Sequence, residues 1–409
     1  MILVEKQNIK KGNPLFQDLD LLCFLSKNMF NAAIYRFREI FFQNQKLQAG
    51  QKRSKLSGFD LLKDLALNSQ PDFIALPRKV SGAAVLSAYQ TFTSYYGLVK
   101  LKTKGLYDKP INLPHYLPKD GRYVVHYSRQ AVSQDPRNEG YAVLSGTDLR
   151  IPTKIPLKDI QGVRVVPKKG YIVVEVLYEK KELPAKANNQ RYAAIDIGVN
   201  NLATISSNVA KPLIINGRPL KSINQFSNKR IAQLQSKLTG NRHTSKRIEA
   251  IRRIRQNKIQ DYLHKASREI INYLASNDIN SLIIGKNKEW KQGVALGKKN
   301  NQNFVDIPFA RFIEMIQYKA KLEGFDVVTN EESYTSKCSF LDMESIGKRD
   351  TYCGKRIKRG LFRSSSGKLI NADLNGSLNI LRKVVGDAVF DGHPIEVTSS
   401  PLVLTIKLS

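Results

Sequence analysis

The chain has 409 residues, enough for two to four domains, and its 66 Lys and Arg against 35 Asp and Glu give a formal net charge of +31 at pH 7. Such an excess destabilises a compact protein by self-repulsion unless a polyanion shares the complex, and nucleic acid is the commonest polyanion. Three cysteines are too few for a disulfide framework, and no apolar run is long enough to span a bilayer. We therefore expect a cytoplasmic protein with no membrane partner.

The first hundred residues predict a mainly helical domain. Residues 2–9 have the character of a strand, and apolar residues at helical spacing predict helices over 18–42 and 81–100. The polar, basic stretch between them at 44–58 predicts a loop. We therefore expect a helical domain over 13–104.

The next eighty residues predict a β domain. From about 105 to 182 the apolar period changes to two, and the sequence PKKG at 167–170 predicts a hairpin turn. We expect a small β-barrel or sandwich, built from residues 1–12 together with 105–185.

The second half of the chain alternates strands and helices. In order, the pattern predicts two strands within 191–207, a basic helical region at 224–276, a strand at 281–285, a helix at 308–324, a strand at 325–331 and a helix at 373–385. This order is typical of a mixed α/β sheet with covering helices. Residues 335–369 are expected to be irregular and basic, and the tail after Gly386 to be weakly ordered.

Two aspartates stand where elements of this α/β region begin or end. Asp196 lies at the end of the apolar strand AAIDIG, where burial of a carboxylate is costly unless a cation compensates it. Asp373 opens the last helix. Each also has a plain structural explanation, Asp196 as a turn residue and Asp373 as an N-cap. Together they favour a metal pair.

Cleavage of a phosphodiester by two Mg²⁺ ions needs three or four carboxylates around ions about 4 Å apart. A third acid is therefore required. The residues alone leave three candidates open, namely Glu289 beyond strand 281–285 and the adjacent Glu331 and Glu332 at the end of strand 325–331.

These segments resemble the TnpB family, RNA-guided nucleases of bacterial insertion sequences and relatives of the type V CRISPR effectors. The resemblance rests on AIDIGVNNLATI, LIIGKNKEWKQ, EESYTSKCS, NADLNGSLNILRK and DYLHKASREII, and it extends from Phe30 to about Lys383. It implies an RNase H-like (RuvC) nuclease domain over 190–334 and 369–386, with the β-barrel as a wedge domain and the helical domain as a recognition domain. Residues 335–368 would be a target-strand-loading insert, and 387–409 a tail.

The resemblance also assigns the acids. It makes Asp196 the first and Asp373 the last metal-binding aspartate of a two-Mg²⁺ site. Where the family usually has its middle glutamate this chain has Asn287, a poorer ligand. Some relatives use a relocated glutamate before a YTS-like motif, so we rank Glu332 first, then Glu331, then Glu289.

The family usually carries a four-cysteine zinc ribbon within the insert. This chain has only Cys338 and Cys353 there, with no histidine between them, so we expect no zinc and an insert held by packing. Cys23 lies on a helical apolar face, where a core position is expected.

The expected partners are a guide RNA from the transposon end and double-stranded target DNA, bound by a monomeric, nucleoid-associated endonuclease. The side chains expected to contact nucleic acid are Arg78, Lys79, Lys246, Arg247, Arg252, Arg253, Arg255, Lys258 and Trp290. Two alternatives are a nuclease-inactive, RNA-guided repressor and a strand-joining transposase. Asn287 raises the first, but the presence of Asp196, Glu332 and Asp373 argues against it, and the family resemblance does not support the second.

Overall fold

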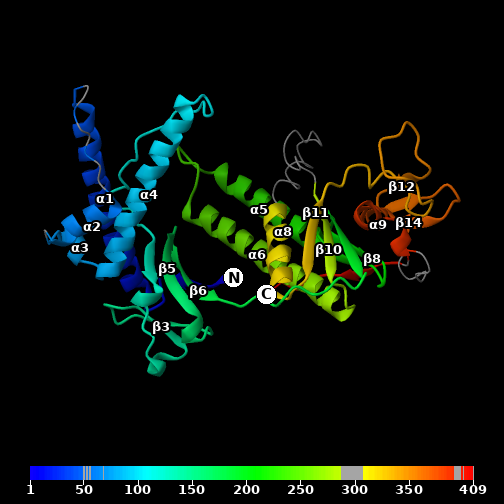
Figure 1. Cartoon of the computed structure of the whole chain (residues 1–409), viewed down its shortest axis with the longest axis horizontal. Coiled ribbons are helices and arrows are strands. Elements are labelled where there is room, and N and C mark those ends of the chain that lie inside the picture. The colour runs from blue at the N-terminus through cyan, green and yellow to red at the C-terminus, as the bar shows by residue number, and fades with distance from the viewer. Residues whose placement is uncertain are drawn as a thin grey trace. The chain divides into compact units, whose positions relative to one another are not determined.

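The computed structural model describes residues 1–48, 51, 54, 57–67, 69–286, 307–390, 398 and 400–408. It divides into two compact units, Met1–Lys180 and Lys181–Ser409, which are described separately below (Figure 1). Asn287, Glu289 and Trp290 lie outside the described residues.

Unit 1 packs helices against an antiparallel sheet. Its helices are α1 (Phe16–Gln45), α2 (Gly58–Leu67), α3 (Pro71–Ile74) and α4 (Arg78–Thr103), and its strands are β1 (Ile2–Lys10), β2 (Val125–Ser128), β3 (Tyr141–Val143), β4 (Arg150–Pro152), β5 (Ile160–Lys168) and β6 (Tyr171–Glu179). Short 3-10 helices occupy Arg129–Ala131, Pro136–Asn138 and Leu157–Asp159. Both long helices extend beyond the ranges predicted from the sequence.

The sheet of unit 1 has the order β1-β6-β5-β2, and β3 pairs only with β4. The predicted hairpin is confirmed: β5 and β6 pair across a turn in which Gly170 has a φ of 87°, a conformation that favours glycine. The closed barrel is not confirmed, because among the described residues these strands form an open sheet. One apolar core joins helices and strands, and it includes Cys23 as predicted.

Unit 2 is built on a mixed six-stranded sheet. Its strands are β7 (Tyr192–Ile197), β8 (Asn201–Ser207), β9 (Leu213–Asn216), β10 (Ser281–Gly285), β11 (Asp326–Asn330) and β15 (Leu402–Leu404), in the order β11-β10-β7-β8-β9-β15. Strands β11, β10 and β7 are parallel to one another, and β8 runs antiparallel to both β7 and β9. The predicted mixed α/β sheet is confirmed.

Helices cover both faces of this sheet (Figure 1). They are α5 (Arg218–Gln235), α6 (Lys246–Ser276), α8 (Phe309–Leu322) and α9 (Ala372–Val385), with a 3-10 helix at Ala388–Phe390. The odd-numbered residues of β7 pack in one core with α6 and α8, whereas Ala194 packs with Ile380 and Leu381 of α9. Because strand side chains alternate between faces, Asp196 shares the α9 face with Ala194.

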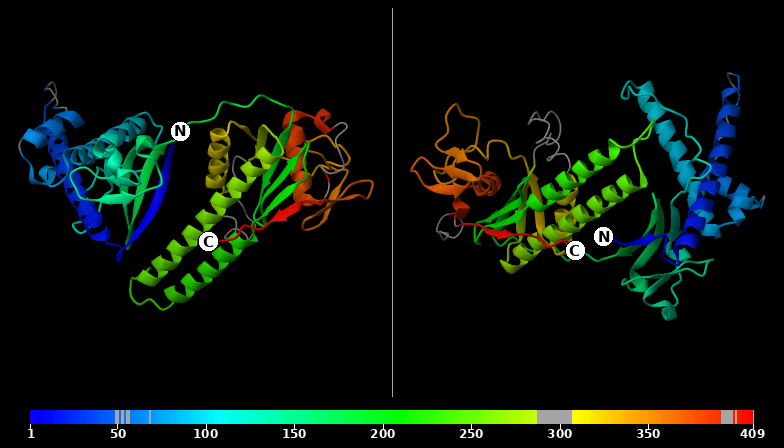
Figure 2. Two further views of the ribbon diagram at one scale, coloured as in Figure 1. Left: turned by 90° about the horizontal axis from the view of Figure 1, so that it is seen from below. Right: turned by 180° about the vertical axis from the view of Figure 1, so that it is seen from behind.

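The basic region 224–276 is two helices rather than one continuous stretch. Helix α5 ends at Gln235, and the chain then turns through Gly240, whose φ is 62°. Ser245 caps the start of α6, and its Oγ accepts a hydrogen bond from the Ile248 amide at 3.3 Å. The resulting α5–α6 pair extends well past the sheet (Figure 2). No helix of the described residues is long and apolar enough to cross a membrane.

Two segments expected to lack structure contain strands. Within the insert, β12 (Lys355–Lys358) and β13 (Leu361–Arg363) pair, and β14 (Leu369–Asn371), directly after the insert, completes a three-stranded antiparallel sheet beside α9. The weakly ordered tail is corrected at Leu402–Leu404, which pairs in parallel with β9 because that edge still has free backbone groups. Ile406, which follows, is buried in the core.

Hydrogen bonds as well as apolar packing hold the insert together. The buried Glu344 carboxylate accepts hydrogen bonds from the backbone amides of Ser339 at 2.8 Å and Cys353 at 3.0 Å. The Asp342 carboxylate accepts from the amide of Ser365 at 2.9 Å. These two carboxylates join turns of the insert that are up to 23 residues apart in the chain.

Candidate active site

Asp196 lies near the carboxyl end of β7, on the side of the sheet that α9 covers. Small side chains let α9 approach the strand closely: the Ser377 hydroxyl donates to the Ala194 carbonyl at 2.9 Å, and Gly376 sits directly over Asp196. A Cβ added at Gly376 would lie 2.8 Å from Asp196 Oδ2. The glycine therefore leaves the space in which this carboxylate lies.

Asp373 is in the first turn of α9, but it is not the N-cap. The cap is Asn371, whose Oδ1 accepts hydrogen bonds from the backbone amides of Asp373 at 3.0 Å and Leu374 at 3.1 Å. The capping explanation offered for Asp373 is therefore wrong. Its two oxygens instead contact side chains from elsewhere in unit 2: Asn201 Nδ2 donates to Oδ2 at 2.7 Å, and Arg356 Nη2 lies 3.3 Å from Oδ1.

Glu332 follows β11, two residues after the strand ends. Its carboxylate reaches back towards the neighbouring strand, since a Cβ added at Gly285, the last residue of β10, would lie 2.7 Å from Glu332 Oε2 and 3.3 Å from the Ile195 carbonyl. Glu331 is exposed, and its carbonyl accepts a hydrogen bond from Lys383 Nζ at 2.8 Å. The surroundings of Glu331 and Glu332 therefore differ, although the residues alone left both as candidates for the third acid.

Buried asparagines of α9 fix the segment that carries Glu332. Asn379 Nδ2 donates to the carbonyls of Thr335 at 2.9 Å and Cys338 at 2.8 Å, and Asn375 Nδ2 donates to that of Cys338 at 2.8 Å. Both asparagines are fully buried. The polar residues of the motif NADLNGSLN thus attach the chain after β11 to the helix that bears Asp373.

The three acids interact electrostatically. Burial raises the pKa of Asp196 well above its usual range, the negative charges of Glu332 and Asp373 raise it further, and Arg356 lowers it. Some of the Asp196 surface still meets solvent, although protein atoms surround most of this side chain. No three Asp, Glu, His or Cys side chains in the described part of the chain form a set that would hold an ion without rearrangement.

The raised pKa of Asp196 predicts a stability effect. Between the unfolded value of 3.8 and the higher folded value the native state binds the extra proton, so stability falls as pH rises through this window and stays lowered at neutral pH. We therefore expect Asp196→Asn to stabilise the metal-free protein at pH 7 by about 1 kcal/mol, or roughly 2–4 °C in unfolding temperature.

Thermal unfolding at pH 7 and at pH 4 measures this effect. The gain should shrink at the lower pH, where Asp196 in the wild type takes up its proton. An equal gain at both values would mean that the substitution acts through packing rather than through charge.

Arginines of the insert lie beside the acids. Arg356 is in β12, and Arg359 follows it in the turn before β13. With the Asn200 amide oriented to accept, the Arg359 guanidinium donates to its oxygen at 2.9 and 3.0 Å. Asn200 and Asn201 form the corner between β7 and β8. The insert thus brings positive charge close to Asp196 and Asp373, a feature that was not predicted from the sequence.

The predicted nucleic-acid contacts are spread over both units. Arg78 and Lys79 are exposed at the start of α4, and Lys79 donates to the Gln130 side chain at 2.6 Å. Lys246, Arg247, Arg252 and Lys258 are exposed on α6, whereas Arg253 and Arg255 are half-buried. Arg255 Nε donates to Asn224 of α5 at 2.7 Å, so this arginine also ties the two helices together.

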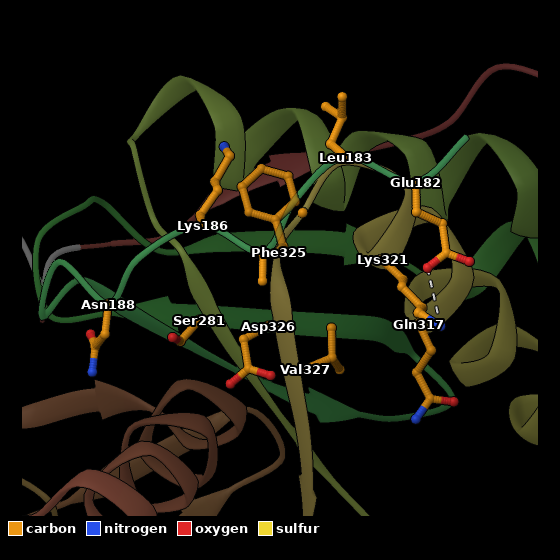
Figure 3. Close-up of a pocket in the computed structure, with 12 residues that line it drawn as sticks. Glu182, Leu183, Lys186, Asn188, Ser281, Gln317, Lys321, Phe325, Asp326 and Val327 are labelled. Carbon is orange, nitrogen blue, oxygen red and sulfur yellow. Dashed lines mark ion pairs between the residues drawn. The ribbon is translucent and has the colours of Figure 1, made fainter. Parts of the chain in front are cut away.

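A cavity of about 590 Å³ lies at the amino-terminal ends of β10 and β11, opposite the strand ends near which the acids lie (Figure 3). The first residues of β10 and β11, Ser281 and Asp326, line it together with the segment 182–188. Lys186 Nζ lies 3.9 Å from the centre of the Phe325 ring. Because the acids lie at the carboxyl ends of these strands, the cavity is not part of the acidic site.

Two family models match the chain in unequal parts. Residues 172–291 match OrfB_IS605, a probable transposase, and residues 309–380 match the Cas12f1-like TNB domain. A curated relative, the TnpB-like protein ORF457 of Acidianus two-tailed virus, is 27% identical over 270 residues, which are 64% of this chain and 53% of that protein. Over these residues the chain is similar to TnpB-like proteins.

A solved structure resembles this chain at the level of the fold. The cryo-EM structure of a Cas12f1–sgRNA–target DNA complex matches with a TM-score of 0.53 at 14% identity, covering 89% of this chain and 82% of the other. At that identity the likeness extends to the α/β fold with its mixed sheet. This chain spans about half the length of the curated relative that it matches.

Proposed function

We propose that this protein is an RNA-guided, Mg²⁺-dependent DNA endonuclease with an RNase H-like (RuvC) active site made of Asp196, Glu332 and Asp373. The observation that carries the proposal is that Glu332, which follows β11, and Asp373, at the start of α9, both act electrostatically on the buried Asp196 of β7. A buried carboxylate that two like charges destabilise favours a site built to receive cations.

The donor set fits divalent magnesium, which prefers carboxylate oxygens and retains water. Asp196, Glu332 and Asp373 would hold the ions. When bound, two such ions supply an activated water and stabilise the leaving oxygen. Since Asn201 and Arg356 hold the Asp373 oxygens, the Arg356 contact must loosen before Asp373 can take a ligand role. The freed guanidinium would then be placed to neutralise a phosphate.

The partners proposed are a guide RNA from the transposon end and double-stranded DNA. The net charge of +31 supports a polyanionic partner. The exposed cations of α6 offer a surface for a nucleic-acid backbone, while base pairing with the guide would supply sequence specificity. The solved Cas12f1 relative is itself a complex with sgRNA and target DNA.

The alternative of a nuclease-inactive repressor is not favoured. It rested on Asn287, which takes the place of the usual middle glutamate, but Glu332 supplies an acid from the adjacent strand. A catalytically dead derivative needs none of the three acids, whereas this chain has all three, and Glu332 and Asp373 both act electrostatically on Asp196.

The test of guidance is to purify the protein from its host and sequence the RNA that remains bound. We expect one discrete species from the transposon end, and cleavage of a matching DNA duplex only when that RNA and Mg²⁺ are both present. Recovery of bulk cellular RNA with unguided cleavage would leave a basic nuclease. Binding of the target without cleavage would restore the repressor alternative.

A further inference from the structure

The C-terminal halves of α1 and α4 lie away from the sheet of unit 1 (Figure 1). They carry a group of partly exposed aromatic rings. We call it the aromatic tip; its members are Phe41, Phe42, Phe92, Tyr95 and Tyr96. Neighbouring ring centres are 5.3–6.5 Å apart. Phe92 anchors the group in the core, whereas Phe42 is 44% and Tyr96 50% exposed.

Cations surround the aromatic tip, and acids are scarce. Lys100, Lys102 and Lys104 are exposed at the end of α4, and no acid occurs between Tyr89 and Tyr107. On α1, Glu39 is paired with Arg36 at 3.0 Å. Arginine contributes as well: the Arg38 guanidinium carbon is 5.6 Å from the ring centre of Phe42 and 5.4 Å from that of Tyr116.

The exposed parts of Phe42 and Tyr96 lie outside the core of unit 1, so apolar packing alone does not explain them. Exposed aromatic faces among lysines are what proteins use to hold unpaired nucleotides, because every base stacks on a ring and lysines accompany the phosphates. A second copy of the chain is a poor occupant, since a symmetric pairing would bring the same lysines together.

We propose that the aromatic tip binds unpaired nucleotides by stacking bases on Phe42 and Tyr96, with the lysines of α4 along the backbone. This site goes beyond the proposed cleavage function and does not need an active nuclease. The nucleotides have two sources, a single-stranded part of the guide RNA or a DNA strand displaced from the target, and both present the same chemistry.

The experiment measures binding by the full-length protein, freed of copurified RNA, to a fluorescent 12-nucleotide single strand as RNA and as DNA, and to a 12-base-pair duplex. We expect Phe42→Ala and Tyr96→Ala each to weaken single-strand binding roughly tenfold, without a change in salt dependence and without an effect on the duplex. Tyr96→Trp keeps an aromatic ring at this position and should bind the single strand as the wild type does. Whichever single strand, RNA or DNA, loses more affinity in these variants identifies the source of the nucleotides.

Two further variants complete the design. Replacing Lys100, Lys102 and Lys104 by alanine should reduce the salt slope by about 0.7 for each lysine. Tyr141→Ala removes an exposed ring from β3, beside Arg150, and should have no effect. Folding is checked by circular dichroism.

Three outcomes would overturn the proposal: unchanged single-strand binding by Phe42→Ala and Tyr96→Ala, equal losses on the duplex, or a concentration-dependent dimer that Tyr96→Ala abolishes. The last result would make the aromatic tip an interface between copies. Any of these leaves the proposed nuclease intact, because that proposal is tested by cleavage and by the bound RNA.

Discussion

Replacing Asp196 by alanine is expected to lower DNA cleavage by at least about 10³-fold while guide RNA and target DNA remain bound, because removing one carboxylate of a metal pair removes charge stabilisation that other residues cannot replace. Asp196 is the acid whose pKa both Glu332 and Asp373 raise. In the proposed site its loss would therefore weaken the binding of both ions. The measurement is cleavage of a matched duplex with wild-type and variant complexes at equal occupancy of RNA.

Magnesium-dependent unfolding provides the control for this prediction. Mg²⁺ should raise the unfolding temperature of the wild type, since a ligand that binds only the native state stabilises it, and should leave Asp196→Ala unchanged. Asp326→Ala removes an acid at the opposite end of the sheet, beside the cavity, and should cleave normally. Undiminished cleavage by Asp196→Ala would place the active site elsewhere in the chain.

The position of Asp196 follows from local patterns in the sequence. An apolar strand with one carboxylate at its end has a fixed alternation, so the face that Asp196 shares with Ala194 is set once the strand is recognised. The turn at Gly170 is similarly local, because the backbone there needs a conformation that other residues rarely adopt.

Contacts between segments that are distant in the chain could not be predicted from local sequence patterns. Asn201 meets Asp373 across 172 residues, and Arg356 reaches the same carboxylate from an insert that was expected to be irregular. Nothing in the spacing of these residues indicates their approach, which depends on how α9 crosses the sheet. The edge strand Leu402–Leu404 was missed for the same reason, since three residues acquire strand structure only by pairing with β9.

Glu332→Gln is the second substitution expected to abolish cleavage, whereas Glu331→Gln should retain most of it. The two side chains are adjacent in the chain but differ in surroundings. Glu332 is half-buried, approaches Gly285 and raises the pKa of Asp196 by its charge, whereas Glu331 is exposed. An amide keeps the shape of the side chain but removes the charge that a cation needs, so the loss reports ligation rather than packing.

Three variants made in parallel decide which acid is the middle one. Glu289→Gln joins the pair because that residue was the third candidate from the sequence, and its cleavage should match the wild type. Gly285→Ala provides an independent check, since its Cβ would approach Glu332 Oε2 to 2.7 Å and Ile380 Cδ1 to 2.6 Å, displacing the carboxylate without altering its charge. If Glu289→Gln is inactive and Glu332→Gln is not, the middle acid lies after β10 rather than after β11, and the strand end at Asn330 has no part in the chemistry.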